Sequence, residues 1–318
     1  RSFTARRTSD MHNAATTDVP ILRKTDDERG PHSGSPTAVQ CNLSSRVATA
    51  VFDLPLKPAA IAAAAARWQL HLHPIPRLLH YTWTDCSSVP PRQLSWQRGC
   101  ARINPLHQQW LWSDADNRAL IAMYYPEFLD LYDGYNEHMK RVDAARLFYL
   151  HRFGGTYMDL DFACLRPLDV LPRTPGMAIF GYQLRNNRRG PYAGNVANAF
   201  MAAPPGHPFI SYAISKLRST SMRDLLHATG PMFLSRALGV YLRTVENRSI
   251  VIHTMPRIYA SQWNKKNPCG RGSDDALAKC TAELPDTVVT TFWTNRETWK
   301  KAQRSAKKRR KDNMTYLG

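Results

Sequence analysis

The sequence predicts a mixed α/β domain in which short buried strands alternate with amphipathic helices. Three observations predict it. Residues 137–153 carry apolar side chains at helical spacing, residues 156–162 change to a period of two, and the pair Gly154-Gly155 separates the two patterns. Further strand and helix patterns lie before and after this unit. Because 43% of the 318 residues are hydrophobic, the chain can bury a substantial core.

The first 72 residues are rich in Ser, Thr, Pro and charged side chains and show little periodicity. Residues 1–72 are therefore expected to form a disordered or stem-like extension. No stretch of the sequence approaches the roughly 20 apolar residues that a membrane span requires. No apolar run typical of a signal peptide is visible either. The sequence begins at Arg1 rather than Met, so an anchor or signal upstream of it stays open.

The folded domain is expected to begin near residue 73. Residues 75–83 form a short apolar run bounded by prolines, which predicts the first buried strand. The alternating tryptophans of residues 110–112 predict a second strand, and a helical pattern follows it. Asp114 and Asp116 lie at the start of that helix, where acids cap the backbone and suit the helix dipole. We interpret them as capping and solvated residues and not as metal ligands.

The unit around which the chain is organised covers residues 137–169. Asn136 is the expected N-cap of its helix. On the strand that follows, the period of two places Tyr157, Asp159 and Asp161 on the same side. Two carboxylates one strand repeat apart form a hard oxygen site suited to Mn²⁺ or Mg²⁺. Such an ion would neutralise the charge of a departing diphosphate.

Each of these acids also has a simpler explanation. Taken alone, Asp159 and Asp161 are readily explained as solvated acids at the end of a strand. Asp143 and Arg146 lie three residues apart on the preceding helix, so that their side chains project together. Taken alone, that pair is explained as a surface ion pair worth about 0.3 kcal/mol. Because the helix pair and the two strand acids lie close together in the sequence, we expect them to form one site for a charged ligand.

The run KRVDAARLFYLHRFGGTYMDLDFACLRPLD resembles the signature of the family 32 glycosyltransferases, whose sugar-binding region contains a DXD motif. Four other segments match that family in order and spacing: IPRLLHYTW at 75–83, YPEFLDLYDGY at 125–135, NVANAFMAAPPGHPF at 195–209 and TGPMFL at 229–234. Within the family, the sequence is most similar to the fungal mannosyltransferases that act on inositol phosphorylceramide. The Golgi initiating α-1,6-mannosyltransferases come second.

The resemblance implies a GT-A fold, an α/β sandwich with a Rossmann-like nucleotide half, over residues 73–299. It also implies a metal-dependent enzyme that retains anomeric configuration. Such an enzyme would move a hexose, with mannose favoured, from the nucleotide sugar GDP-mannose to a glycolipid or glycan acceptor. Asp161 would hold Mn²⁺ or Mg²⁺ together with Asp159, which could also contact the ribose. Asp143 and Arg146 would orient the donor hexose.

Further positions are implied to bind the donor, namely His80, Trp83, Asn195, Asn198, Thr298 and Trp299. On their own, a histidine and a tryptophan on an apolar strand are as well explained by core packing. The sequence departs from the family at two places. Tyr81 replaces a glutamine that is common in relatives, and Phe292 or Trp293 falls where relatives carry a histidine. A catalytically inactive member of the family is therefore one alternative.

The sequence has 43 basic and 25 acidic residues, which gives a formal net charge of +18. This charge favours a polyanion or a membrane surface as partner. Residues 300–311 hold eight basic side chains and no acid, so residues 300–318 are expected to form a basic disordered tail. A nucleic-acid-binding protein is the second alternative. It is not favoured, because the basic residues cluster at the termini and the aromatic residues lie in apolar runs.

A phosphatase of the Asp-x-Asp-x-Thr/Val type is excluded, because Ala163 stands where Thr or Val is required. The six cysteines contain no CxxC pair, which argues against a zinc module. Cys86 with Cys100, and Cys269 with Cys280, are close enough in sequence to form disulfides. Together with three N-x-Ser/Thr sequons, the cysteines indicate the secretory pathway. The family resemblance implies a membrane-associated protein in the lumen of the Golgi or endoplasmic reticulum.

Overall fold

The structure is a computed structural model, and it describes residues 74–172, 174–184, 195–244, 250–253, 258–259, 269 and 273–292. The chain divides into two units, Arg1–Thr37 and Ala38–Gly318, and all described residues belong to the second. The expected N-terminal extension and the basic tail lie outside the described residues.

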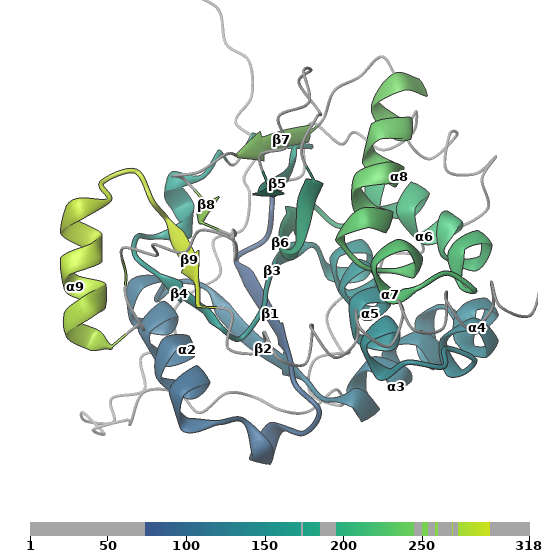
Figure 1. The fold of residues 1–318 in the computed structure, drawn as a ribbon, viewed down its shortest axis with the longest axis horizontal. Helices are drawn as coiled ribbons and strands as arrows, with labels where there is room; N and C mark the ends of the chain where they lie inside the picture. Colours follow the sequence, from purple (N-terminus) through teal and green to yellow (C-terminus); the bar gives the residue numbers. More distant parts are fainter. Residues whose placement is uncertain are drawn as a thin grey trace, which may run out of the picture. The chain divides into compact units, whose positions relative to one another are not determined.

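Strands and helices alternate along the described chain (Figure 1). The strands are β1 (Leu78–Thr82), β2 (Gln108–Trp112), β3 (Gly155–Met158), β4 (Phe162–Cys164), β5 (Ala178–Leu184), β6 (Asn195–Ala203), β7 (Ile250–His253), β8 (Ile258–Tyr259) and β9 (Val289–Thr291). The helices are α2 (Pro91–Ile103), α3 (Asp114–Tyr124), α4 (Leu129–Asp133), α5 (His138–Phe153), α6 (Pro208–Thr220), α7 (Leu225–Ala228), α8 (Pro231–Thr244) and α9 (Asp274–Glu283). Short 3-10 helices are η3 (Cys86–Ser88), η4 (Pro126–Phe128) and η5 (Leu168–Val170).

The main sheet has the strand order β2-β1-β3-β6-β5-β7. Strand β1 pairs in parallel with both β2 and β3, whereas β6 is antiparallel to β3 and to β5. Helix α2 connects β1 to β2, and α3 to α5 connect β2 to β3. Parallel strands with helical crossovers are the arrangement of a Rossmann-like half. The α/β class and the Rossmann-like half expected from the sequence are confirmed.

Both faces of the main sheet are covered. Helices α3 to α8 lie on one side, and α2 with the strands β4, β8 and β9 lies on the other (Figure 1). The alternation of the strands explains this division, since Trp110 and Trp112 join one hydrophobic cluster while Leu111 joins the other. The expected strand at residues 110–112 is therefore confirmed, and it is buried on both faces.

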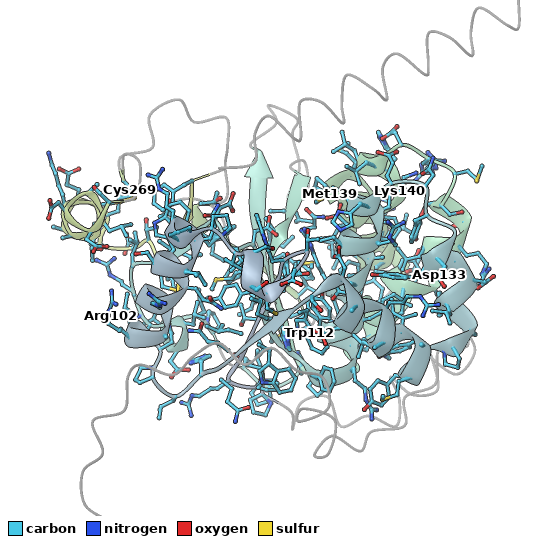
Figure 2. All side chains as sticks on the ribbon, turned by 90° about the horizontal axis from the view of Figure 1, so that it is seen from below. Arg102, Trp112, Asp133, Met139, Lys140 and Cys269 are labelled. Atoms are coloured by element: carbon cyan, nitrogen blue, oxygen red, sulfur yellow. A yellow bond between two sulfur atoms is a disulfide. The ribbon has the colours of Figure 1, made fainter. Side chains whose placement is uncertain are left out.

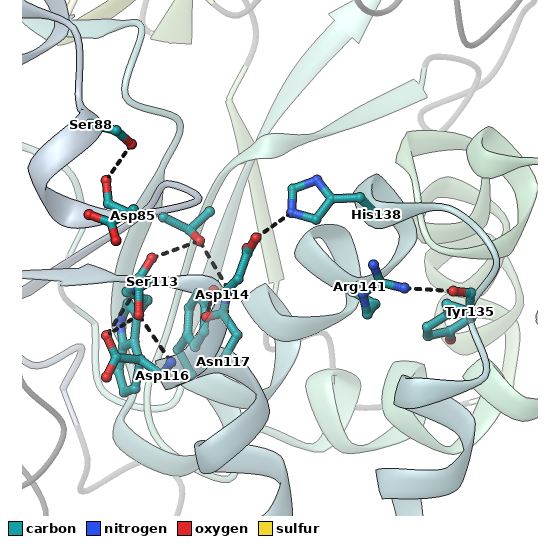
Figure 3. Close-up of polar contacts among 12 residues, drawn as sticks. Asp85, Ser88, Ser113, Asp114, Asp116, Asn117, Tyr135, His138 and Arg141 are labelled. Carbon is teal, nitrogen blue, oxygen red and sulfur yellow. Dashed lines mark hydrogen bonds and ion pairs between the residues drawn. The ribbon is translucent and has the colours of Figure 1, made fainter.

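The start of α3 has the capping role expected from its acids (Figure 3). Ser113 is the N-cap and forms a capping box with Asp116, whose carboxylate accepts from the Ser113 backbone N–H at 3.0 Å. Asp114 contacts His138 instead, with 2.7 Å between Oδ2 and Nε2. One prediction at a helix start was wrong, because Glu137 and not Asn136 occupies the N-cap position of α5. The Asn136 side chain accepts a hydrogen bond from the Lys140 ammonium.

The glycine pair after α5 is required by close packing. Gly154 and Gly155 both have positive φ, at 63° and 98°. A Cβ atom on Gly154 would lie 2.6 Å from the ring of Pro205, and one on Gly155 would lie 2.8 Å from the carbonyl oxygen of Leu78. The helix therefore ends where the sequence predicts, and the chain enters β3 directly beside β1.

The expected single strand over residues 156–162 is wrong. Strand β3 ends at Met158, and a tight turn follows in which the Phe162 N–H donates to the Asp159 carbonyl at 3.1 Å. Leu160 is buried in the core at the tip of this turn. Strand β4 then pairs with β9 in a second sheet of order β4-β9-β8. Asp159 and Asp161 thus lie on a turn between two sheets and not on one side of one strand.

One disulfide connects the second sheet to helix α2. Cys100 on α2 pairs with Cys164 on β4, with 5.0 Å between the Cα atoms. The expected Cys86–Cys100 disulfide is therefore wrong. The expected Cys269–Cys280 disulfide is confirmed. Cys86 is also disulfide-bonded, and none of the cysteines that the structure describes is free.

Candidate active site

Arg146 is the centre of the candidate site. Its side chain is 5% exposed and lies on the buried face of α5. Its Nη2 atom lies 3.0 Å from Oδ1 of Asp143 and 3.3 Å from Oδ1 of Asp159, and its Nη1 donates to the backbone carbonyl of Asn198 at 2.9 Å. The guanidinium also lies over the ring of Tyr157, 4.7 Å from the ring centroid. One arginine therefore connects α5, the end of β3 and the middle of β6.

Neighbouring acidic groups keep Arg146 protonated. Burial acts to lower the pKa of Arg146, but the nearby Asp159, Tyr157 and Asp143 together outweigh burial and raise it. Arg146 is therefore a permanent cation. The sequence-based alternative of an exposed surface pair between Asp143 and Arg146 is wrong, because both side chains are buried.

Asp143 is a buried acid with an unusual environment. Burial raises its pKa to about 7, although Arg146 acts to lower it. Both carboxylate oxygens lack a directed hydrogen bond from any residue that the structure describes, despite the ion pair. The neighbouring Asn198 side chain also acts to lower the pKa of Asp143 as a hydrogen-bond partner, although its Nδ2 atom makes no hydrogen bond of regular geometry. Orphaned polar atoms of this kind are costly inside a protein, and they can be satisfied by a ligand with hydroxyl groups.

Asp159 is the more exposed of the two acids of the DXD motif, with 30% of its side chain accessible. The Tyr157 hydroxyl donates to its Oδ1 atom at 2.6 Å, and Arg146 pairs with the same atom. Among the described residues, the hydrogen bond and the ion pair of this carboxylate both involve Oδ1 and not Oδ2. The carboxylate is thus held by one oxygen, and the other can bind a ligand or an ion.

Asp161 is held from the opposite side, by the second sheet. It is 9% exposed, and its Oδ1 accepts from the Thr291 hydroxyl at 3.2 Å. Its backbone carbonyl accepts from the Phe292 N–H at 2.9 Å. The Phe292 ring stacks on Trp96 of α2, with 4.6 Å between ring centroids. The segment in which relatives carry a histidine therefore lies against the DXD turn.

The donor set fits a hard divalent cation that keeps other ligands. Two carboxylates on one short turn supply oxygen ligands, which Mg²⁺ and Mn²⁺ prefer. Among the described residues no cluster of three or more His, Cys, Asp or Glu side chains could hold a metal by itself. A cation at Asp159 and Asp161 would thus complete its coordination with water and substrate phosphate.

The structure does not fit a nucleotide-binding role for His80. His80 is fully buried, its Nδ1 atom accepts from the indole N–H of Trp112 at 3.1 Å, and its Nε2 lies 2.8 Å from the Gly154 carbonyl. Since Nδ1 is an acceptor, the proton is on Nε2 and is donated to Gly154. His80 therefore fixes the end of α5 from inside an aromatic cluster. This environment fits the core-packing alternative for His80.

The other expected donor-binding residues lie in different places. Trp83 follows the end of β1, is half-buried, and donates from its indole N–H to the Ser88 carbonyl at 3.2 Å. Asn198 is brought to Asp143 and Arg146. Asn195 begins β6 opposite Leu184. Thr298 and Trp299 lie outside the described residues, as does Trp293.

Two contributors to the site were missed in the sequence. Tyr157 was placed on the side of the two acids, but its bond to Asp159 was not predicted. The spacing of two residues was the available signal. Thr291 lies 130 residues from Asp161 in the sequence, and no local pattern connects the two.

Comparisons with known proteins agree with this geometry. Residues 90–177, which include both acids of the DXD motif, match the family described as glycosyltransferase sugar-binding region containing DXD motif. The chain is 33% identical over 167 residues to "Inositol phosphoceramide mannosyltransferase 3" of Schizosaccharomyces pombe, covering 51% of this chain and 44% of that protein. It is 29% identical over 208 residues to "Mannosyl phosphorylinositol ceramide synthase CSH1" of Saccharomyces cerevisiae, covering 63% and 52%.

Among solved structures, the PaToxG glycosyltransferase is similar over 59% of this chain and 76% of that chain, with 16% identity and a TM-score of 0.44. A likeness this loose transfers no residue role. The similarities to named proteins are thus to glycosyltransferases, over part of this chain. Residues 90–177 match the DXD-containing sugar-binding region of glycosyltransferases, and this match supports the family resemblance stated from the sequence.

The chain spans about half the length of the curated relatives it matches. In the part of the chain that the structure describes, no helix combines the length and the apolar content needed to cross a membrane.

Proposed function

We propose that this protein is a metal-dependent hexosyltransferase, with GDP-mannose as its favoured donor and a glycolipid as its acceptor. The observation that supports it best is the buried Arg146, which pairs with Asp143 and with Asp159 of the DXD motif. The names of the relatives support mannose as the sugar and an inositol phosphoceramide as the acceptor class. We place the catalytic domain at residues 73–299, between an N-terminal extension and a basic tail.

The residues divide the chemistry of the transfer between them. Asp159 and Asp161 would hold Mn²⁺ or Mg²⁺, which stabilises the negative charge of the departing diphosphate when it is bound. Asp143 would accept hydrogen bonds from the donor hexose, because its two oxygens lack directed donors from the described protein. Arg146 fixes Asp143 and Asp159, and Asn198, whose side chain lies beside Asp143, would contact the same ligand. Trp83, Asn195, Thr298 and Trp299 are further proposed contacts of the donor.

Retention of anomeric configuration follows from the family resemblance. None of the described carboxylates of the site is an evident nucleophile, since Asp143 is paired with Arg146 and the two other acids are assigned to the cation. We therefore propose attack of the acceptor hydroxyl on the same face as the leaving group. In that reaction the new glycosidic bond forms as the bond to the diphosphate breaks, and a diphosphate oxygen takes the proton of the acceptor.

The disulfides support an oxidising compartment, such as the lumen of the Golgi or endoplasmic reticulum. The net charge of +18 supports contact with an anionic membrane surface, where a glycolipid acceptor would be found. Nucleic acid is not the favoured partner.

The test is hydrolysis of a panel of nucleotide sugars by the purified protein with Mn²⁺ and with excess chelator. We expect GDP-mannose to be turned over fastest and the chelator to abolish turnover. Equal hydrolysis with and without the metal contradicts the metal assignment.

The same experiment distinguishes an inactive family member. That alternative rests on Phe292, which lies against the DXD turn and carries no group that could hold a metal or a phosphate. Tight binding of GDP without turnover of any sugar, even with a glycolipid acceptor present, would favour it.

A further inference from the structure

A pocket of about 180 Å³ opens between helices α6 and α8, away from the DXD turn. Helix α6 contributes Tyr212 and Lys216, which lie one turn apart. Helix α8 contributes Arg236 and apolar side chains such as Val240. Arg223, in the connection between α6 and α7, closes one end. No acidic residue is among the described residues that line the pocket.

Its positive charge is not neutralised. Lys216, Arg223 and Arg236 are exposed, and no carboxylate of the described chain pairs with any of them. Lys216 only lies over the Tyr212 ring, 5.0 Å from its centroid. By contrast, Arg218 on the same helix is paired with Asp130. Three cations that share one pocket without a counter-ion attract an anion, and arginine suits phosphate in particular.

Hydrogen bonds from a buried lysine hold the backbone at the rim of the pocket. Lys140 of α5 is 2% exposed, and its ammonium donates to the backbone carbonyls of Ser221 at 3.4 Å and of Arg223 at 2.7 Å. These two bonds fix the turn that carries Met222 between them. Met222 is 97% exposed, the most exposed of the large hydrophobic side chains in the described chain. An apolar side chain held out beside a cationic pocket suits a surface that is both anionic and apolar.

We propose that this face of the protein, the α6–α8 pocket with Met222, docks onto an anionic membrane. The phosphate of a lipid head group would enter the pocket between Lys216, Arg223 and Arg236, and Met222 would insert among the lipids. The exposed Met222 favours a lipid over a soluble phosphate, because an apolar side chain can insert among lipids but makes no favourable contact with a hydrated anion. It also disfavours nucleic acid, which is bound by stripes of basic and aromatic side chains. The proposal does not depend on the transfer activity.

The experiment is co-sedimentation of the full chain with phosphatidylcholine vesicles, with and without phosphatidylinositol. The triple variant Lys216→Gln, Arg223→Gln, Arg236→Gln should bind the anionic vesicles at least about tenfold more weakly than the parent protein. The matched control removes three exposed cations elsewhere, by Arg98→Gln, Arg102→Gln and Lys279→Gln. Arg102 lies far from Lys140 and from the helical side of the sheet (Figure 2). The control should stay within about threefold of the parent protein.

Insertion is measured separately, by a polarity-sensitive fluorophore on Met222→Cys. Its emission should shift to the blue on anionic vesicles, whereas the same label on Leu106→Cys, which is 68% exposed in the α2–β2 connection, should not shift. Hydrolysis of a soluble nucleotide sugar should be unchanged in the pocket variant. A failure of membrane docking is thereby distinguished from a failure of the proposed enzymatic function.

Three results would overturn the proposal. Equal losses in the two triple variants would mean that only net charge matters. A label at Met222 that stays in water would mean that this face does not meet the membrane. The third result comes from adding about 10 mM inorganic phosphate at constant ionic strength. If the pocket variant and the control variant then bind the vesicles equally well, the pocket binds a soluble anion.

Discussion

The buried Arg146 of α5 forms an ion pair with the partly exposed Asp159, which directly follows β3, with 3.3 Å between Nη2 and Oδ1. The same nitrogen pairs with Asp143 one helical turn earlier. Helix α5 thus positions the Asp159 carboxylate through Arg146, and the buried Asp143 of the same helix pairs with the same guanidinium. Breaking either contact removes the partner of a charged side chain. For Arg146 and Asp143 that charge is buried, where water reaches it poorly.

The first prediction concerns Arg146. Arg146→Met should destabilise the protein by about 3 kcal/mol, because it leaves Asp143 buried without a cation. The free energy of unfolding in urea measures this. In an Asp143→Asn background the same substitution should cost at least about 1 kcal/mol less, since one unpaired carboxylate is gone. An equal cost in both backgrounds would show that the two side chains are not coupled.

The second prediction concerns the pH dependence of stability. Burial raises the pKa of Asp143 to about 7, above its ordinary value of 3.8, so the folded protein binds this proton more tightly than the unfolded chain. Its favourable contribution is complete below the unfolded pKa and is lost as the pH rises through about 7. The stability of the parent protein relative to Asp143→Asn should therefore fall by a few kcal/mol between about pH 5 and pH 8. A constant difference would place the pKa of Asp143 near its ordinary value.

In kinetics, the same Asp143→Asn variant should bind the donor more weakly while remaining folded. The reason is that a carboxylate accepts hydrogen bonds at both oxygens, whereas an amide accepts at one. The KM for the nucleotide sugar measures this. An unchanged KM in a folded variant contradicts a role in orienting the sugar.

The third prediction concerns Asp161. Asp161→Ala should abolish metal-dependent turnover while the protein stays folded, because one of two hard ligands is lost. The matched control is Thr291→Val, which removes the hydrogen bond to Asp161 but keeps the carboxylate. This control should cost about 1 kcal/mol of stability and keep most of the activity. An active Asp161→Ala variant would remove Asp161 from the metal site.

The fourth prediction concerns the disulfides. Cys100 and Cys164 are 64 residues apart and Cys269 and Cys280 are 11 apart, so the first bond restricts the unfolded chain more. Removing it by Cys100→Ser and Cys164→Ser should cost about 3 to 4 kcal/mol. Removing the second bond in the same way should cost less. Thermal unfolding with and without reductant compares the two pairs, and the reverse ranking would contradict the loop-length argument.

The sequence predicted those features that are formed by residues close to one another along the chain. The tryptophan alternation of β2, the capping role of Asp116 at the start of α3 and the glycine exit of α5 each depend on residues within a few positions of one another. The turn at Asp159 could not be predicted in this way, because β4 leaves the main sheet to pair with β9, far along the chain. The Cys100–Cys164 bond was missed for the same reason.

Within the candidate site, sequence spacing brought Asp143 and Arg146 together correctly, since three residues on a helix share a face. It could not reveal that the pair is buried, because burial depends on β6 and Asn198 packing against α5. The buried environment of His80 could not be predicted either, because its partners, Trp112 and Gly154, come from two other parts of the chain.

The turn that joins the two sheets also has a consequence for how the protein is made. Both acids of the DXD motif are synthesised well before Thr291 and Phe292, which hold Asp161 from the second sheet. A nascent chain that has reached α8 already contains the whole α5–β3 cluster, but its second acid still lacks these two anchors. Since domains form non-local strand pairs late, Asp161 acquires its final position only after β9 has left the ribosome. A chain truncated by premature termination before β9 therefore carries the DXD motif in its sequence without the hydrogen bonds that hold it in place.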